Sequence, residues 1–513
     1  MQRVVRISVS LRKPDYTFPW QSQSRSPNKG VGTGFFYNGP NKETWVVTCA
    51  HVVEAAYDIK FLHNKKEISA RLLFVCPELD IAVIEPIESD ETSQFPKLDN
   101  NIINLEELKA NDSVIAVGFP LANEQIITSN GIISGSNGYL IQTTAAINSG
   151  NSGGPLLQKH TKAIIGINSS KAAGMLFSSI DNIGYSVPIS LLEKCISIYS
   201  DHKSKGNESE EHKPFKIPFS SSSGITFSRS TPKIRKCYSD CDEDGCLISE
   251  IEHPQLKDIL KPKDVLLSVG NDKNTFNLYG KQLSTDKKWI EQDIDLKTYL
   301  ILFGFNEKIN FKYWNAEEGE KTHSVDCFNS YDPTIKELFY YDDIDSIDYL
   351  VLGGMVLIEL TENLQERYYE DVMWKVLTQE KGKQRNRVVI STIFPSSLPD
   401  EMKVVEAFDA IHKINNKDVY TLEDVKKIVT STTHSSNCLE IEMFPYAKLI
   451  LPVERLKEDD QTFLELFNYP INKTLSNLPL SNTNTESNPN LEIDSDDTSA
   501  ETDESTTVRI RIG

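Results

Sequence analysis

Long hydrophobic runs are missing from this chain of 513 residues. The most apolar stretch, YLVLGGMVLIEL at residues 349–360, is shorter than the ~20 residues that a membrane-spanning helix needs. The first residues, MQRVVRISVSLRKPDY, contain no apolar core of the kind found in secretory signal peptides. The sequence therefore predicts no membrane span and no secretory leader, and we interpret residues 349–360 as buried strands.

Cysteine and basic charge are also scarce. Eight cysteines are scattered over the chain, which is not the pattern of a disulfide framework, so we expect a reducing compartment, the cytoplasm or the nucleus. The basic start of the chain, free of acidic residues before Asp15, leaves import into an organelle open. A net charge of −20 at pH 7 argues against nucleic acid as a partner, because phosphate contacts need a basic surface.

Apolar runs and turn residues divide the chain into distinct parts. Residues 1–200 contain short apolar runs separated by Gly, Asn and Pro, which predict an all-β barrel or sandwich. A polar, Ser-rich linker follows at 201–216. Residues 217–330 and 331–470 are predicted to form two smaller mixed α+β domains, and 471–513 form a disordered acidic tail that has too little apolar surface to fold.

The two smaller domains repeat the same order of signals. Each begins with a Gly-hydrophobic segment, SGITFS at 223–228 and GGMVLIEL at 353–360, and continues with a β-rich run. The second copy ends in an amphipathic helix, TLEDVKKIV, for which Thr421 is the expected N-cap and Asp424 the partner in a capping box. We interpret the pair as a degenerate repeat.

The segment AAINSGNSGGPLL at 145–157 crowds small residues around Ser152. Acyl transfer by a serine needs backbone N–H donors for an oxyanion, and glycine allows such donors to come close to a ligand. Ser152 is therefore a candidate nucleophile, with the N–H groups of Gly150 and Ser152 as an oxyanion hole. A Gly-rich hairpin turn is the alternative interpretation.

A serine nucleophile also needs a base, and His51 is the candidate. It follows a β-rich run in WVVTCAHVVEAA, whereas the other histidines lie in polar or linker-like surroundings. Asp80 begins the apolar strand DIAVIEP and could orient the imidazole, since a buried charge needs a partner. A half-buried structural histidine and an ordinary strand-capping aspartate are the alternatives for each residue taken alone.

The segments TCAHVV, DIAVIE and INSGNSGGP follow one another in the order His, Asp, Ser, and together they resemble the trypsin-like serine proteases of the Deg/HtrA (protease Do-like) family. PDYTFPWQ and NIGYSVP are similar to its plant and eukaryotic branch, which has two PDZ-type domains. The resemblance implies an all-β double-barrel protease domain followed by two mixed α+β PDZ-like domains. It makes His51 the general base, Asp80 the residue that holds its tautomer, and Ser152 the nucleophile.

The resemblance also implies where a substrate binds. The floor of the specificity pocket falls on Ala146, which carries no carboxylate to pair with Arg or Lys, so we expect cleavage after small or medium aliphatic residues. The segment IIGINSS is expected to pair with the substrate backbone through Ile167 and Ser169.

PDZ domains bind peptides by adding a strand to a sheet edge and holding the terminal carboxylate with loop N–H groups. The candidate loops contain Gly224 and Ile225 in the first module, and Gly354 and Met355 in the second. A role in assembly alone is the alternative for these modules.

The predicted function is that of a serine endopeptidase that cleaves unfolded or tagged polypeptides, is gated by its PDZ-like domains, and forms a homo-oligomer, a trimer or a multiple of three. The alternative is a non-proteolytic peptide-binding scaffold or holdase chaperone. No cofactor is expected. Cys237, Cys241 and Cys246 lie close in the sequence but lack a C-x-x-C pair and a neighbouring histidine, so no metal is predicted.

Overall fold

The computed structural model describes residues 3–470 except 22–27, 88–94, 97–99, 104–106, 171–182, 206–212, 220–222, 229, 272–274, 280–281, 284–293, 305–306, 327–337, 342–343, 368–378, 381–382, 385, 433–436 and 445–446. The acidic tail predicted at 471–513 lies outside the described residues. Of the helices within the described residues, none has both the length and the apolar composition that crossing a membrane would require.

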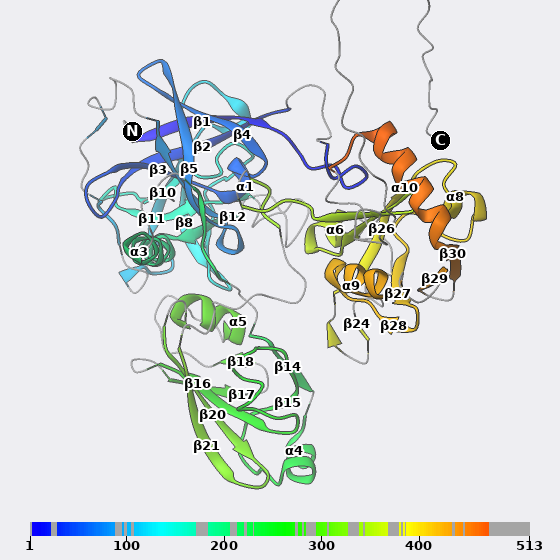
Figure 1. The fold of residues 1–513 in the computed structure, drawn as a ribbon. Coiled ribbons are helices and arrows are strands. Elements are labelled where there is room, and N and C mark those ends of the chain that lie inside the picture. Colours follow the sequence, from blue (N-terminus) through cyan, green and yellow to red (C-terminus); the bar gives the residue numbers. More distant parts are fainter. Residues whose placement is uncertain are drawn as a thin grey trace, which may run out of the picture.

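Two six-stranded β-barrels form the first part of the chain (Figure 1). The first barrel has the order β5-β4-β1-β2-β3-β6 and closes because β5 also pairs with β6. The second closes in the order β10-β11-β12-β9-β8-β7. The strands are β1 (Val4–Leu11), β2 (Asn28–Asn38), β3 (Thr44–Thr48), β4 (Ala56–His63), β5 (Lys66–Cys76), β6 (Ile81–Pro86), β7 (Ser113–Gly118), β8 (Ile127–Asn137), β9 (Leu140–Thr143), β10 (Pro155–Gln158), β11 (Ile164–Asn168) and β12 (Gly184–Pro188). The predicted double-barrel fold is confirmed.

The basic start of the chain forms strand β1. Its sequence VVRISVSL alternates, and Val5, Ile7 and Val9 are buried in the barrel core, as the two-residue period of a strand requires. It pairs with β2 on one side and with β4 on the other. Residues Val4–Leu11 therefore form a strand of the first barrel that is paired along both edges.

The segment predicted as a linker is regular at both ends. Helix α3 (Ile189–Lys205) continues to Lys205 because one face, which includes Leu192 and Tyr199, packs onto the barrel core. Residues Phe215–Lys216 form a short strand, β13, that adds to β5 in parallel. The polar composition of 201–216 did not predict either element, since the last turn of α3 is exposed and β13 is only two residues long.

The first module is an eight-stranded sheet that has β14 at one edge, in the order β14-β15-β16-β17-β18-β19, with β20 paired to β16 and β21 paired to β20. Its core includes Ile248, Leu266 and Phe311. The elements are β14 (Ile225–Ser228), α4 (Pro232–Ser239), β15 (Cys246–Ile251), β16 (Val265–Gly270), β17 (Thr275–Tyr279), β18 (Gln282–Leu283), β19 (Ile294–Asp295), α5 (Leu296–Tyr299), the π-helical turn Leu300–Gly304, β20 (Ile309–Asn315) and β21 (Gly319–Val325).

The second module is a seven-stranded sheet in the order β22-β23-β26-β27-β29-β30, with β28 paired to β27. Residues 349–360 form the buried hairpin of β22 and β23, as predicted. Thr421 caps α9 through its hydroxyl, and Asp424 accepts from the Thr421 N–H in return, which confirms the capping box. The elements are β22 (Tyr349–Leu352), β23 (Met355–Glu359), α6 (Glu362–Arg367), β24 (Gln379–Glu380), β25 (Lys383–Gln384), β26 (Val388–Ile393), α8 (Leu398–Met402), β27 (Ala410–Ile414), β28 (Lys417–Asp418), α9 (Leu422–Thr432), β29 (Cys438–Met443), β30 (Lys448–Pro452) and α10 (Val453–Phe467).

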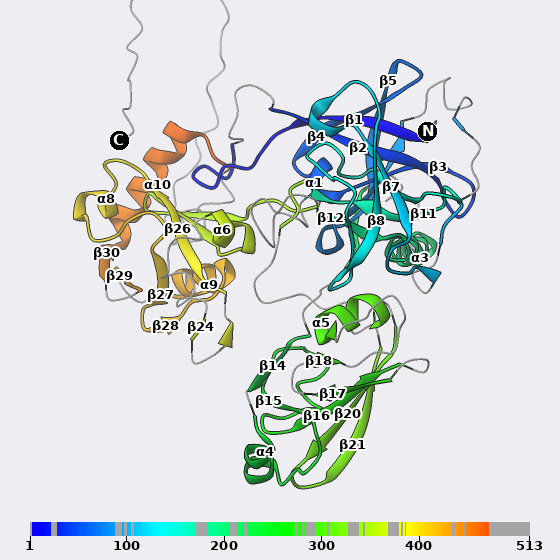
Figure 2. The ribbon, with the colours of Figure 1, turned by 180° about the vertical axis from the view of Figure 1, so that it is seen from behind.

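The two modules lie on different sides of the barrels in both views (Figures 1 and 2). Aromatic residues between β1 and β2 attach the barrels to the second module. The Trp20 ring lies 5.3 Å from each of the rings of Tyr349 and Tyr469, and Phe18 stacks on Phe467 at 6.0 Å. An aromatic cluster thus joins a segment near the start of the chain to the last helix of the second module.

Candidate active site

The imidazole of His51 rests on a carboxylate. His51 lies in α1 (Ala50–Val53), the short helix that follows β3. Its Nδ1 is 2.9 Å from both carboxylate oxygens of Asp80, and its backbone N–H donates to Asp80 Oδ1 at 3.0 Å. Since a carboxylate only accepts, Nδ1 carries the proton in this pair, which leaves Nε2 free to accept one.

Asp80 is fixed from both sides. It follows the 3₁₀ turn Pro77–Leu79 with a left-handed backbone (φ 55°), and it accepts from the Ser169 hydroxyl at 2.6 Å. Burial by itself would raise the pKa of the Asp80 carboxyl, but hydrogen bonds from His51 and Ser169 outweigh burial and hold that pKa below its usual value. The carboxylate therefore stays charged at neutral pH.

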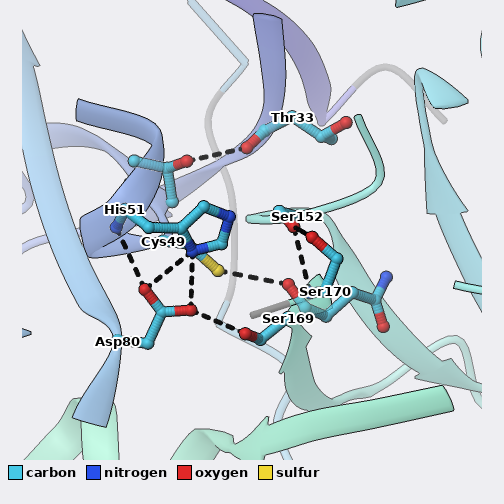
Figure 3. Close-up of polar contacts among 9 residues, drawn as sticks. Thr33, Cys49, His51, Asp80, Ser152, Ser169 and Ser170 are labelled. Atoms are coloured by element: carbon cyan, nitrogen blue, oxygen red, sulfur yellow. Dashed lines mark hydrogen bonds and ion pairs between the residues drawn. The ribbon is translucent and has the colours of Figure 1, made fainter. Parts of the chain in front are cut away.

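The Ser152 side chain lies near the same pair of residues (Figure 3). In Figure 3 the His51 ring lies between the Asp80 carboxylate and Ser152. The hydroxyl itself is bound by Ser170, whose N–H donates to Ser152 Oγ at 3.1 Å and whose hydroxyl oxygen lies 2.6 Å away from it. Among the described residues, no hydrogen bond joins Ser152 Oγ to His51. The structure thus brings the three predicted residues to one place, with the serine held by a fourth residue that the sequence did not identify.

The loop before Ser152 fixes the direction of two of its N–H groups. The Ser149 carbonyl accepts from Leu121 N at 2.8 Å, and the Asn151 carbonyl accepts from Gly154 N at 3.0 Å. In a trans peptide the N–H points opposite to the C=O, so the N–H groups of Gly150 and Ser152 point away from these anchors. Neither has an acceptor among the described residues.

Glycine is required in this loop for space as well as for conformation. Gly150 has a φ of +95°, and a Cβ there would lie 2.4 Å from the Phe119 carbonyl oxygen. A Cβ on Gly154 would lie 2.1 Å from the carbonyl oxygen of Val117. The crowding of small residues around Ser152 therefore lets the loop pack tightly on the 117–121 segment.

The structure places the residues expected to bind substrate in different environments. Ala146 is exposed at the start of the loop, where its N–H donates to Ser129 Oγ at 2.9 Å. Ile167 is buried in β11 and paired on both sides, with Pro155 and with Val187, so its backbone is used by the barrel and does not face a substrate. Ser169 follows the end of β11, and its hydroxyl donates a hydrogen bond to Asp80. The expectation for Ile167 is therefore wrong, because β11 is an interior strand.

The two candidate peptide loops differ from each other. Gly224 and Ile225 lead into β14, the edge strand of the first module. Gly354 and Met355 lie in the hairpin turn between β22 and β23, and β22 already pairs along the outer side of β23. A peptide therefore cannot pair with β23 on the side that β22 occupies, and β22 itself is the end strand of this sheet, so the second loop leads away from an edge strand and not into one as Gly224 and Ile225 do.

Cys49 lies beside the His51–Asp80 pair, and one ligand atom of each of these three residues falls within 4.8 Å of the other two. Their chemistry does not favour a metal. Cys49 Sγ donates to the Asn168 carbonyl at 3.2 Å, and burial raises the pKa of this thiol well above its usual value. His51 and Asp80 satisfy each other, so these residues are accounted for as a hydrogen-bonded set.

Comparison with known proteins agrees with this geometry. Residues 32–167, which include all three predicted catalytic residues, match the family model of the trypsin-like peptidase domain. A mitochondrial Do-like 3 protein of Arabidopsis thaliana is 25% identical over 468 residues, covering 86% of this chain and 74% of its own length. The serine protease Do-like HtrA of Bacillus subtilis is 33% identical over 180 residues, covering 32% of this chain and 38% of its own length.

Among solved structures, the HtrA-type protease AlgW with decapeptide matches with a TM-score of 0.42 and 19% identity, covering 63% of this chain and 94% of its own. The match over residues 32–167 places a trypsin-like peptidase domain in the two barrels. More narrowly, the chain is similar to the Do-like, or HtrA, serine proteases, and these relatives support proteolysis over a purely non-proteolytic scaffold.

The contact between Ser170 and Ser152 competes with the contact that catalysis needs. We predict that Ser170→Ala raises the rate at which a fluorophosphonate probe acylates Ser152 by ~2–10-fold, the worth of one neutral hydrogen bond. Ser170→Thr, which keeps the hydroxyl, is the matched control and should react at the wild-type rate. An unchanged or slower rate in Ser170→Ala would show that the contact does not restrain the nucleophile.

Proposed function

We propose that this protein is a serine endopeptidase in which Ser152 is the nucleophile, His51 the general base and Asp80 the residue that orients the base. The observation that carries the proposal is the His51 Nδ1 contact of 2.9 Å with an ionised, buried Asp80, on the side of the ring away from Ser152. This arrangement leaves Nε2 to take the serine proton.

The reaction proceeds in two halves. Ser152 Oγ attacks the scissile carbonyl carbon and its proton passes to His51 Nε2, while the developing oxyanion is held by the N–H groups of Gly150 and Ser152. The C–N bond then breaks as Nε2 returns the proton to the leaving amine, which yields an acyl-enzyme. Water, deprotonated by the same Nε2, hydrolyses the ester and restores the serine.

We infer that the enzyme prefers a small or medium aliphatic residue before the scissile bond. Support comes from Ala146 and from its contact Ser129, neither of which carries a charge that could pair with Arg or Lys. Extended, unfolded or tagged polypeptides are the inferred substrates.

We propose that the first module captures substrate termini by strand addition at β14. The Ile225 N–H donates to Ser223 Oγ at 3.2 Å, a neutral contact that a peptide carboxylate can replace with a stronger one. The exposed Thr226 and Ser228 on this edge strand suit pairing with a peptide backbone.

We propose that the second module does not capture peptides and serves as a fixed anchor for the barrels. Strand β22 occupies the position of a peptide strand, and the Asp460 carboxyl in α10 lies near the backbone N–H groups of Gly353 and Gly354. Leu456 and Phe463 from the same helix lie directly on this turn. The chain's own strand and carboxyl thus fill the site that a peptide would use.

Assembly and location are inferred from the relatives. We propose a homo-oligomer, a trimer or a multiple of three, which acts on polypeptides and not on nucleic acid, in keeping with the net charge of −20. The relatives named above give no support to the expected cytoplasm or nucleus, since the Do-like 3 protein is named mitochondrial. We propose a reducing compartment, because the eight cysteines are scattered along the chain and lack the pattern of a disulfide framework.

The nucleophile assignment predicts a sharp loss of activity. Ser152→Ala should lower the hydrolysis of unfolded β-casein by several orders of magnitude and abolish fluorophosphonate labelling, with an unchanged melting temperature. Ser149→Ala, an exposed residue of the same loop, is the control and should keep both activities. Wild-type protein that prevents aggregation of β-casein without cleaving it would favour the holdase alternative.

The contrast between the modules predicts where a peptide binds. In the Ser152→Ala background, a peptide with a free C-terminal carboxylate should protect backbone amides of residues 224–228 from hydrogen–deuterium exchange and leave residues 354–359 unchanged. The same peptide with an amidated C-terminus is the control and should protect weakly. Protection confined to residues 354–359 would reverse the assignment.

Asp460 predicts a pH dependence of stability. Burial raises the pKa of this carboxyl to about 8, while an unfolded aspartate titrates near 3.8. Between these values the folded form keeps a proton that the unfolded form has lost, so the free energy of unfolding decreases as the pH rises from about 4 to 8.

Asp460→Asn stays neutral and lacks this decrease. Relative to wild type it should become more stable by at least ~1 kcal/mol between pH 5 and pH 8, measured as melting temperature at a series of pH values. Parallel pH profiles for the two proteins would contradict the assignment.

A further inference from the structure

Thr33 connects the first barrel to the loop that carries the nucleophile. It lies in β2 and is completely buried, with 0% of its surface exposed. Its backbone N–H donates to the Ser152 carbonyl at 2.9 Å, and its hydroxyl donates to the Gly150 carbonyl at 2.6 Å. One residue of the first barrel thus binds two carbonyls of the nucleophile loop in the second.

These two contacts complete the anchoring of the loop. Leu121 N and Gly154 N hold the carbonyls of Ser149 and Asn151, so with Thr33 every carbonyl from 149 to 152 has a donor. The hydroxyl matters most at Gly150, because glycine rotates freely about its Cα. The peptide planes on both sides of that Cα are fixed only when the Gly150 carbonyl is also held.

The Thr33 hydroxyl has a second partner, since it accepts from Phe119 N at 3.0 Å. Phe119 belongs to the segment whose Leu121 N holds the Ser149 carbonyl. The hydroxyl therefore joins β2, the 119–121 segment and the nucleophile loop at one atom.

Two neighbouring glycines make room for Thr33. A Cβ on Gly118 would lie 2.9 Å from Thr33 Oγ1, and a Cβ on Gly153 would lie 2.1 Å from the Thr33 carbonyl oxygen. The Thr48 hydroxyl donates to that same carbonyl at 2.8 Å and fixes the Thr33 backbone from behind. A β-branched side chain has few χ1 rotamers, which keeps the hydroxyl aimed at Gly150.

We propose that Thr33 is a positioning residue for the oxyanion site: its hydroxyl holds the Gly150 carbonyl out of the cleft and so keeps the Gly150 N–H directed at the oxyanion. This inference rests on the proposed serine endopeptidase function. A residue that acts in this way affects the transition state more than the bound substrate, because the oxyanion forms only during attack.

The test compares Thr33→Val, which removes the hydroxyl and keeps the shape, with Thr33→Ser, which keeps the hydroxyl. For an aliphatic peptide substrate, we expect Thr33→Val to lower kcat by ~10–100-fold with KM within ~3-fold of wild type, as expected for a buried hydrogen bond lost with its partners unsatisfied. A peptide boronic acid, which mimics the tetrahedral intermediate, should lose affinity by a similar factor. Thr33→Ser should stay within ~3-fold of wild type in all three measurements.

Thr48→Val is the control for packing, since the Thr48 hydroxyl lies against Gly153 but donates its hydrogen bond to the Thr33 carbonyl and not to a carbonyl of the loop. A role in stability alone predicts that Thr33→Val and Thr48→Val lower the melting temperature and kcat alike, and that result would overturn the proposal. Equal kcat values for Thr33→Val and wild type would also overturn it and leave the endopeptidase function intact. If the wild type neither cleaves peptides nor reacts with a fluorophosphonate, both proposals fail. Should Thr33→Val not fold, the comparison of Thr33→Ala with Thr33→Ser decides in the same way.

Discussion

The site depends on the direction of four consecutive carbonyl groups. Every carbonyl from Ser149 to Ser152 is bound by a donor on the side away from the cleft, and the N–H groups of Gly150 and Ser152 face inward as a result. The donors come from different places: Thr33 in the first barrel, Leu121 in a neighbouring segment and Gly154 in the loop itself. Both barrels must therefore be folded and in contact before this loop has a fixed shape.

The charge of the Asp80 carboxylate is the second requirement of the site. Asp80 is buried, yet it remains ionised because hydrogen bonds from His51 and Ser169 offset the free energy lost when the carboxylate is removed from water. That charge determines which imidazole nitrogen carries the proton and prepares the other to receive one. Ser170 holds the nucleophile in a resting orientation, so the base and the serine are close together but not yet bonded.

Apolar runs and turn residues predicted an all-β first domain and the buried strands at 349–360, and the resemblance carried by the His51, Asp80 and Ser152 segments predicted the double barrel and the grouping of these three residues. Neither identified Thr33, Ser169 or Ser170 as partners of these residues, since ordinary threonines and serines become special only through contacts formed in the folded chain. The expectation for Ile167 failed because a strand's sequence does not tell whether both of its edges are paired. The pairing of β22 with β23 beside the second candidate loop was not predicted for the same reason.

The aromatic cluster around Trp20 has a consequence for how the protein is made. Trp20 leaves the ribosome hundreds of residues before its partner Tyr469. Its other partners Phe18 and Tyr349 are synthesised earlier and can contact the indole first. The cluster is complete only after the whole of α10 has been synthesised, because Tyr469 follows that helix. The full attachment of the second module to the barrels is therefore a late step in the formation of the tertiary structure.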